Sequence, residues 1–205
     1  ISDSVIHDSS PPVVVISDTP SSPTSNSAYD INVLSDDGVV SYQYAVINSI
    51  SMCSSGSYNG SWLEESTNLT GNLSGPGTWK VCVIGKDEAG NTQTTASATE
   101  YIWLYDNLQP EVELTSNSDN PTSDASIPVT VTFTENVTGF VASDLNISGA
   151  TAANFTGAGT LYSFDLTPTT SGTITVDIAA GVALDSSGNN NAVADQFSIV
   201  YDNEP

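Results

Sequence analysis

Carboxylate and amide side chains recur in the same short pattern in each half of this chain. The first copy is "DEAGN" (87–91) and the second is "DSSGN" (185–189). One strand later, each copy is followed by a Tyr-Asp-Asn triplet (105–107 and 201–203). Carboxylate and amide oxygens are the ligands that Ca²⁺ prefers, and the ion takes about six to eight of them. The repeated pattern therefore indicates a candidate calcium site in each half.

The direction of the chain predicts which of these side chains meet. If each half is a β-sandwich whose last strand runs toward its C-terminal end, the turn before that strand lies beside the incoming linker. The turn between the second and third strands lies at the same end, so we expect oxygen ligands from three segments to converge. The candidate calcium ligands are Asp106, Asn107, Glu135, Asp185 and Asn189 in the second half, and Asp8, Asp36, Asp37, Asp87 and Asn91 in the first. Carboxylates held this close repel one another unless a cation lies between them.

A plainer interpretation of the same residues remains open. Asp, Asn and Gly are common in turns, because the side chains bond nearby backbone groups and glycine adopts positive φ. Under that interpretation "DEAGN" and "DSSGN" are turns that bind nothing. The calcium-loop pattern of EF-hands and the calcium-binding nonapeptide repeat are both absent from the sequence.

Cysteine and histidine usage limits the other chemistry that the chain could perform. Cys53 and Cys82 are the two cysteines, and in a secreted protein such a pair favours a disulfide, with two buried free thiols as the alternative. The single histidine, His7, cannot form a zinc site alone. No serine lies in a G-x-S-x-G motif, and no carboxylate pair stands out as a sugar-cleaving pair. We therefore expect that the chain is not an enzyme.

Aromatic residues offer one candidate binding surface. Tyr58 and Trp62 fall in a loop-rich stretch (48–77), where they could form a platform that stacks on a sugar. The alternative is that they close this stretch over a sheet. Trp79, near Cys82 in sequence, is expected in the core beside the disulfide.

The charge balance excludes several classes of partner. The chain has 205 residues with 24 Asp and Glu against 2 Lys and Arg, for a net charge of -22. No basic surface is available to neutralise nucleic-acid phosphates or anionic lipids. No apolar run approaches the roughly 20 residues that a membrane span needs, so we expect no membrane insertion. Cations are the expected counter-partners, and the composition favours a secreted protein. Because the sequence starts at Ile1 and shows no signal peptide, we expect it to be a fragment of a longer protein.

Short β-branched and aromatic runs, separated by turn signals, fill both halves. Strands are predicted at 12–17, 29–35, 39–47, 78–87 and 92–106, and then at 111–116, 127–135, 139–148, 153–159, 161–168, 172–180 and 192–202. No helical period is evident. The prediction is an all-β chain of two tandem immunoglobulin-like antiparallel β-sandwich domains. Residues 1–11 are a leader or linker, 12–106 the first domain with an insertion at 48–77, and 107–205 the second.

The second domain resembles the bacterial Ig-like repeats of large surface adhesins. The resemblance rests on "PEVELTS", "IPVTVTFTENVTGFVASDLNISG", "ANFTGAGTLYSFDLTP", "GTITVDIAAGVALDSSGNNN" and "FSIVYD", which together span nearly all of 110–202. The first domain looks like a more distant relative that keeps "VIGKDEAGN". The resemblance implies stacked modules on the bacterial cell surface, each with neighbouring Ig-like domains of the same chain as partners. In several such families calcium stiffens the junctions.

These observations lead to three functional hypotheses. The first is an extracellular spacer or stalk segment of an adhesin, stiffened by calcium. The second is a module whose insertion (48–77) binds a carbohydrate or protein ligand. The third is an accessory region of a secreted enzyme. An exposed aromatic patch would favour the second, and a calcium-dependent stability would favour the first.

Overall fold

Strands make up almost all the regular structure of this chain. The computed structural model describes residues 8–35, 38–48, 50–54, 56–65 and 67–204. The chain divides into two compact units, Ile1–Asn107 (unit 1) and Leu108–Pro205 (unit 2). Among the described residues there is no helix long and apolar enough to cross a bilayer.

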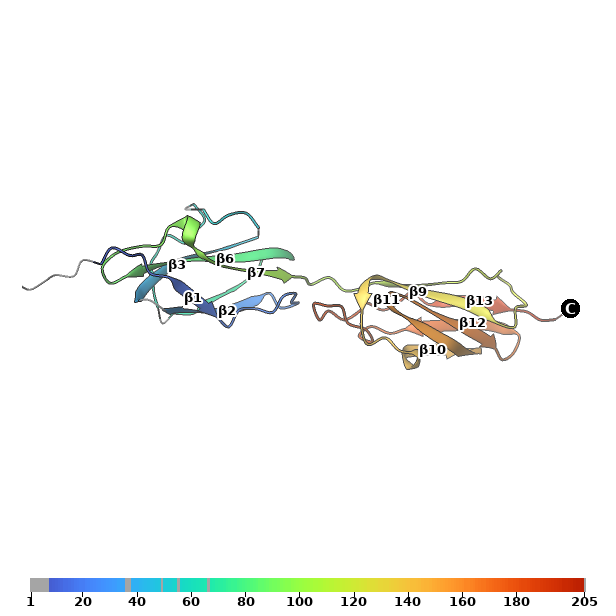
Figure 1. Ribbon diagram of the computed structural model, residues 1–205. Helices are drawn as coiled ribbons and strands as arrows, with labels where there is room; N and C mark the ends of the chain where they lie inside the picture. Colours follow the sequence, from blue (N-terminus) through green and yellow to red (C-terminus); the bar gives the residue numbers. More distant parts are fainter. Residues whose placement is uncertain (1–7, 36–37, 49, 55, 66, 205) are drawn as a thin grey trace, which may run out of the picture. The chain divides into compact units, whose positions relative to one another are not determined.

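Unit 1 is a sandwich of two antiparallel sheets (Figure 1). Its strands are β1 (Val14–Ser17), β2 (Ala28–Ser35), β3 (Val39–Ile47), β4 (Leu63–Glu64), β5 (Leu69–Asn72), β6 (Gly77–Asp87) and β7 (Thr99–Tyr105). One sheet has the order β1-β2-β5 and the other β4-β3-β6-β7. Apolar residues at alternate strand positions, including Ile31, Tyr42 and Trp103, fill the space between the sheets.

Unit 2 repeats this two-sheet architecture with different strand lengths. Its strands are β8 (Val112–Thr115), β9 (Ile127–Val137), β10 (Leu145–Ser148), β11 (Ala150–Pro168), β12 (Gly172–Ile178) and β13 (Phe197–Tyr201). The sheet orders are β11-β9-β8 and β10-β12-β13. The rings of Phe133, Phe140 and Tyr162 meet edge to face, with centroids 5.1–5.9 Å apart. Such edge-to-face contacts suit the charge distribution of aromatic rings.

In both units, the segment after the first strand pairs with the last strand of the other sheet. After β1, Thr24 pairs in parallel with Tyr105, and after β8, Thr122 pairs in parallel with Tyr201. The first segment of each unit therefore bonds to one sheet and then crosses to the last strand of the other. A Pro-Thr-Ser triplet, at 23–25 and 121–123, marks the crossing in each half.

The predicted all-β class and immunoglobulin-like sandwich type are confirmed, but the stretch at 48–77 is more than an insertion. It contains β4, which pairs with β3, and β5, which pairs with β2. Leu69 of β5 is 1% exposed and Leu73 is 7% exposed, so the end of this stretch belongs to the core. These strands were not predicted, because the stretch is mostly polar and only alternate residues of a short strand face the interior.

Several predicted strands have different bounds. The segments 92–98 and 192–196 precede the last strands and do not join them, and 139–144 contains a short 3₁₀ turn, Ala142–Asp144, ahead of β10. In that turn the Asp144 carboxylate accepts a hydrogen bond from the Val141 amide at 2.8 Å. The two strands predicted at 153–168 are one, β11, with an irregularity between Gly159 and Leu161 where its pairing with β9 shifts.

The disulfide joins Cys53 to Cys82, as predicted. Cys82 lies on the outer face of β6, where it packs with Ala45 and Cys53 apart from the core between the sheets. Trp79 is in that core, as predicted, but on the inner face of β6 with Val81. The expectation that Trp79 packs beside the disulfide is therefore wrong, because residues an odd number of positions apart point to opposite faces of a strand.

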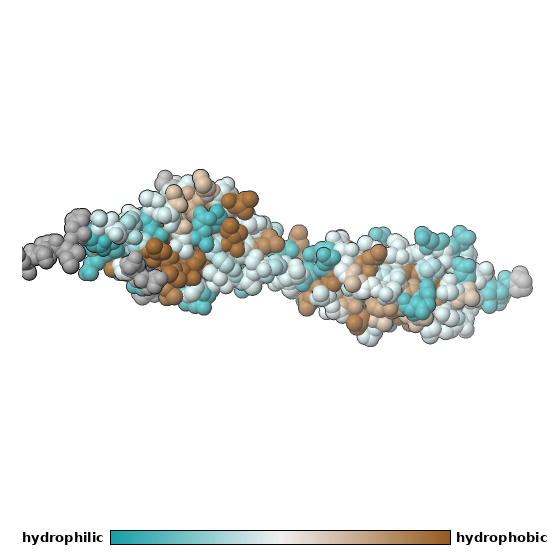
Figure 2. All heavy atoms as spheres, in the orientation of Figure 1, coloured by the Kyte–Doolittle hydropathy of each residue, from teal (hydrophilic) through white to brown (hydrophobic). Residues whose placement is uncertain are grey.

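Apolar side chains also reach the surface. The cross-strand partners Val15 and Leu34 are 38% and 46% exposed on the outer side of their sheet. Figure 2 shows apolar residues on the visible faces of both units. Scattered exposure of this kind is normal for globular domains and identifies no site by itself.

Candidate metal site

The "DSSGN" turn of unit 2 holds its aspartate rigidly. One carboxylate oxygen of Asp185 accepts hydrogen bonds from the amides of Ser187 and Asn189, each at 2.8 Å. The other oxygen accepts one from Asn189 Nδ2, also at 2.8 Å. Gly188 supplies the positive φ of 89° that the turn requires. Asp185 is 6% exposed, so this carboxylate is fixed in place and largely shielded from water.

The "DEAGN" turn of unit 1 has the same design. Asp87 accepts a hydrogen bond from the Asn91 amide at 2.7 Å and another from Asn91 Nδ2 at 2.9 Å. The same Nδ2 group donates to the Asp8 carbonyl at 3.2 Å, which ties the leader to the turn. An open recess of about 440 Å³ is lined by Asp8, Gly38, Asp87, Glu88 and Ala89. Three acidic residues thus border one recess within unit 1.

The turn keeps Asp87 ionised. Burial by itself raises the pKa of this carboxyl group, because a charge is less stable away from water. Hydrogen bonds from the Asn91 side chain and from the Asn91, Gly90 and Ala89 amides stabilise the charged form, and the pKa lies below its ordinary value. The carboxylate is therefore negatively charged and acts as an acceptor at neutral pH.

A second carboxylate approaches the turn of unit 2. The nearest carboxylate oxygens of Glu135 and Asp185 lie within 4.8 Å of each other. Two bonds between Thr138 and Leu184, at 2.8 and 2.9 Å, fasten the end of β9 to the chain that enters the turn. That connection brings Glu135 to Asp185. Two negative charges at this spacing suit a shared cation.

Asp106 and Asn107 are the last two residues of unit 1. The Asp106 amide donates to the Thr24 carbonyl at 3.0 Å, which extends the parallel pairing of Thr24 with the last strand. Asp36 and Asp37, the two turn residues predicted as ligands in the first half, lie outside the described residues.

The predicted aromatic platform is divided between two environments. Tyr58 is half-buried and packs against the cluster of Ala45, Cys53 and Cys82. Trp62 is 38% exposed, and the Lys86 ammonium group lies 5.6 Å from its ring centroid. Among the described rings, no contact joins Tyr58 to Trp62. Trp62 is thus the accessible member of the pair.

The outer face of β6 carries a second cluster of potential ligands. Cys53, Cys82 and Glu100 offer atoms within 4.8 Å of one another. The two sulfur atoms are bonded to each other, so neither is a thiolate that could hold a metal. Glu100 instead pairs with Lys80 Nζ at 2.7 Å. This cluster is structural.

Sequence reasoning missed two buried amides that hold the turns. Each lies two residues after the turn pattern shared by the two units: Gln93 after "DEAGN" and Asn191 after "DSSGN". Gln93 Oε1 accepts from the amides of Gly85 and Val14, at 2.8 and 3.3 Å. Asn191 Oδ1 accepts from the amides of Val182 and Ala183, at 2.9 and 2.8 Å. Each amide residue lies six positions after the aspartate of its turn, and this shared spacing is the sequence feature that could have identified both.

Residues 106–201 match a family model described as a bacterial Ig-like domain. The match spans nearly all of unit 2, which resembles a bacterial Ig-like domain. This match confirms the resemblance predicted for the second half of the sequence. No curated protein matches the chain at a significant level.

Two solved structures are similar to larger parts of the chain. The D00-D0 domain of intimin aligns with 93% of this chain and 100% of its own, at 13% identity and a TM-score of 0.38. A β-glycosidase from Bacteroides vulgatus aligns with 95% of this chain and 25% of its own, at 11% identity and a TM-score of 0.29. At such low identity and TM-score neither likeness bears on function. The expectation that the chain is not an enzyme stays a prediction.

Proposed function

We propose that this chain is a spacer segment of a bacterial surface adhesin and works outside the cell. The match of residues 106–201 to a bacterial Ig-like domain is the observation that carries the proposal. The described part of the chain supports it with antiparallel sandwiches and a disulfide, which persists in oxidising, extracellular surroundings. The neighbouring Ig-like domains of the same chain are its partners.

We further propose that calcium binds to the acidic turn of each unit. In unit 2, Asp185 and Glu135 supply the first ligands, and Asn189 adds an oxygen. Asp106 and Asn107, at the end of unit 1, stay ligands predicted from the sequence. In unit 1, Asp87 and Asp8 border the recess, with Asn91 beside them. The turn hydrogen bonds hold Asp87 and Asp185 in position.

The alternative of plain turns is consistent with the same hydrogen bonds. Asp87 and Asp185 each satisfy backbone amides of their own turn, as aspartates do in turns without metal. The separation between Glu135 and Asp185 favours the calcium proposal, because a plain turn does not require a second carboxylate within 4.8 Å.

A thermal melt tests the calcium proposal. We expect the melting temperature to rise in millimolar calcium relative to excess EDTA, and to rise less in magnesium, because an ion that binds only the folded state stabilises it. Glu135→Gln should remove part of the rise without breaking the turn hydrogen bonds of Asp185. Glu204→Gln, which makes the same charge change on an exposed residue, is the control. An identical melting temperature in calcium and in EDTA would mean that the turns bind no calcium.

The linker offers an independent readout. A protease that cuts after glutamate can attack Glu111, which directly follows the linker proline Pro110. If Asp106 helps to bind calcium, the ion should restrain this segment and slow cleavage there. Cleavage after Glu111 that proceeds equally fast with and without calcium would count against a role for Asp106.

A second candidate function rests on Trp62. Its ring is exposed and stands beside the Lys86 ammonium group, an arrangement that suits a sugar or an acidic protein segment. A glycan array probed with the wild-type chain and with Trp62→Ala separates this function from the spacer. Binding that is lost in the variant would favour a ligand-binding module.

A further inference from the structure

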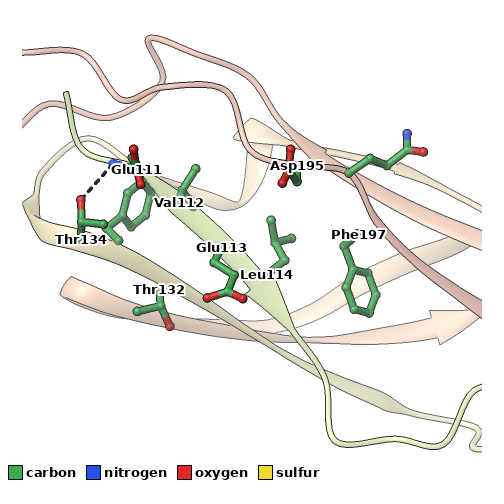
Figure 3. Close-up of a pocket in the computed structure, with 10 residues that line it drawn as sticks. Glu111, Val112, Glu113, Leu114, Thr132, Thr134, Asp195 and Phe197 are labelled. Carbon is green, nitrogen blue, oxygen red and sulfur yellow. Dashed lines mark hydrogen bonds between the residues drawn. The ribbon is translucent and has the colours of Figure 1, made fainter.

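An open seam runs between the edges of the two sheets of unit 2. β8 is the outer strand of one sheet and β13 is the outer strand of the other. Two recesses, of about 460 and 200 Å³, lie along the seam and share Phe197 in their lining. Figure 3 shows the larger recess, with Leu114 on the β8 side and Phe197 on the β13 side.

Hydrogen bonds close the seam at both ends. At one end the Ala192 amide donates to the Pro110 carbonyl at 2.9 Å. At the other, the Thr122 amide donates to the Val200 carbonyl at 2.9 Å, and the Val200 amide donates to Asn120 Oδ1 at 2.9 Å. Among the described residues, no backbone hydrogen bond crosses the seam between these ends. The seam is therefore a gap of fixed length.

The edge of β8 presents backbone groups to this gap. The Glu111 carbonyl accepts a bond from the Thr134 amide at 3.0 Å, and the Glu111 amide donates to Thr134 Oγ1 at 3.0 Å, so the peptide groups of Glu111 face β9. Peptide groups alternate in direction along an antiparallel strand. The N–H and C=O groups of Val112 and Leu114 consequently point into the seam. An edge with groups in this direction can pair with another extended chain.

The side chains along β8 are apolar on the inner face and acidic on the outer face. Val112 and Leu114 face the interior of unit 2, at 8% and 9% exposed, and Phe197 lies opposite them. Glu111 and Glu113 alternate with them on the outer face, and the exposed Asp195 borders the recess from the other side. A strand added along β8 would therefore place every second side chain beside a glutamate and the others beside apolar residues.

We propose that this seam binds an extended peptide segment in which basic and apolar residues alternate. The added strand pairs with the backbone of Val112 and Leu114, its basic side chains lie next to Glu111 and Glu113, and its apolar side chains face Phe197. Both lysines of the chain are in unit 1, so the acidic rim of the seam has no basic residue of unit 2 to neutralise it. A second copy of this chain, with a net charge of -22, is disfavoured as the occupant.

Three short probe peptides test the proposal on the whole chain. The first is an acetylated and amidated Lys-Val-Lys-Val-Lys, and the second replaces each lysine by glutamate. The third keeps the lysines and carries N-methyl groups on the amides that would face β8. We expect the first to bind, the second not to bind, and the third to bind far more weakly, because N-methylation removes the donors needed for strand pairing while it preserves charge.

Amide exchange locates the added strand. We expect the Val112 and Leu114 amides to gain protection when the first peptide binds, whereas the Glu113 amide, which faces β9, should not change. Glu113→Gln combined with Asp195→Asn should weaken binding by about tenfold, because opposite charges on adjacent strands attract. Glu204→Gln is the matched control and should bind as the wild type does.

Each remaining outcome would overturn the proposal. Equal binding of the methylated and unmethylated peptides, or binding without new protection at Val112 and Leu114, would mean nonspecific attraction of a cation to an acidic protein. Absence of binding by the first peptide at millimolar concentration would mean that Glu111 and Glu113 serve only to keep the β8 edge from pairing.

Discussion

The two buried amides show how single residues shape the acidic turns. Asn191 is fully buried, accepts bonds from Val182 and Ala183, and donates to the carbonyls of Ala179 and Ala192, at 2.9 and 2.7 Å. One side chain thus satisfies four backbone groups that have left the sheet. Gln93 does similar work in unit 1, where its Nε2 donates to Ser97 at 2.9 Å.

Substitution of Asn191 should therefore be costly. Asn191→Ala leaves buried backbone donors and acceptors without partners, and we expect unit 2 to lose about 3 kcal/mol of unfolding free energy. Urea denaturation measures the loss. Asn190→Ala, a change of the same residue type at the exposed neighbouring position, is the control. A loss of similar size in both variants would contradict the role assigned to Asn191.

The lowered pKa of Asp87 predicts a pH dependence of unit 1. A carboxyl group with a folded-state pKa below its ordinary value of 3.8 stabilises the fold while it is ionised. This contribution is fully present above that value and is lost as the pH falls through the lower folded-state value. We expect Asp87→Asn to lower the melting temperature most at pH 7, and progressively less as the pH falls from 4 toward 2.

The neighbouring exposed Glu88 provides the control for this experiment. Glu88→Gln makes the same change of charge, so it accounts for the general relief of repulsion when an acidic protein is acidified. A destabilisation by Asp87→Asn that stays constant across the same pH range would show that the charge of Asp87 does not stabilise the turn.

At the scale of elements, β6 is the strand on which unit 1 depends most. Its inner face packs Trp79 and Val81 into the core, and its outer face carries Lys80 and Cys82, which are 4% and 0% exposed. Lys80 Nζ bonds to Glu100 and to the Ser51 carbonyl at 3.0 Å. The segment after β3 therefore covers the outer face through both the disulfide and this lysine.

Removal of the disulfide should release that segment. The bond closes a loop of 29 residues, and loops of this size lose roughly 3 to 4 kcal/mol of stability when opened. We expect the double variant Cys53→Ser, Cys82→Ser to destabilise unit 1 by about this amount and to expose residues 50–62 to proteolysis. Unit 2 should melt as before, which serves as the internal control. Unchanged proteolysis of this segment would show that Lys80 and packing alone hold it.

At the scale of the whole molecule, the dominant quantity is charge. A net charge of -22 on 205 residues makes the folded chain repel itself, and screening by salt reduces that repulsion. The same charge favours solubility, and cations stay the predicted counter-partners.

We therefore expect sodium chloride to stabilise the chain without any specific site. The melting temperature should rise by a few degrees between about 10 mM and 1 M salt, because the Debye length falls from roughly 30 to 3 Å over that range. Calcium at millimolar concentration should act beyond this effect if the acidic turns bind it. A melting temperature that falls with salt would mean that ion pairs, and not repulsion, dominate.

The sequence alone determined the class of fold and favoured the disulfide, which the structure contains. Alternating β-branched and aromatic runs such as 39–47 give strands wherever one face is buried, and β3 has these same bounds. The resemblance of the second half to bacterial Ig-like domains could also be predicted, because the order of its strands and turns can be seen directly in the sequence.

Only the tertiary structure decided which distant groups meet. The polar stretch that contains β5 became a core strand because β2 offered it a partner, which no local pattern encodes. The approach of Glu135 to Asp185 depends on bonds between Thr138 and Leu184, 46 residues apart. The open seam beside β8 exists because two sheet edges diverge between fixed ends. Hydrogen bonding and packing between remote segments, rather than the preference of any residue, set these sites.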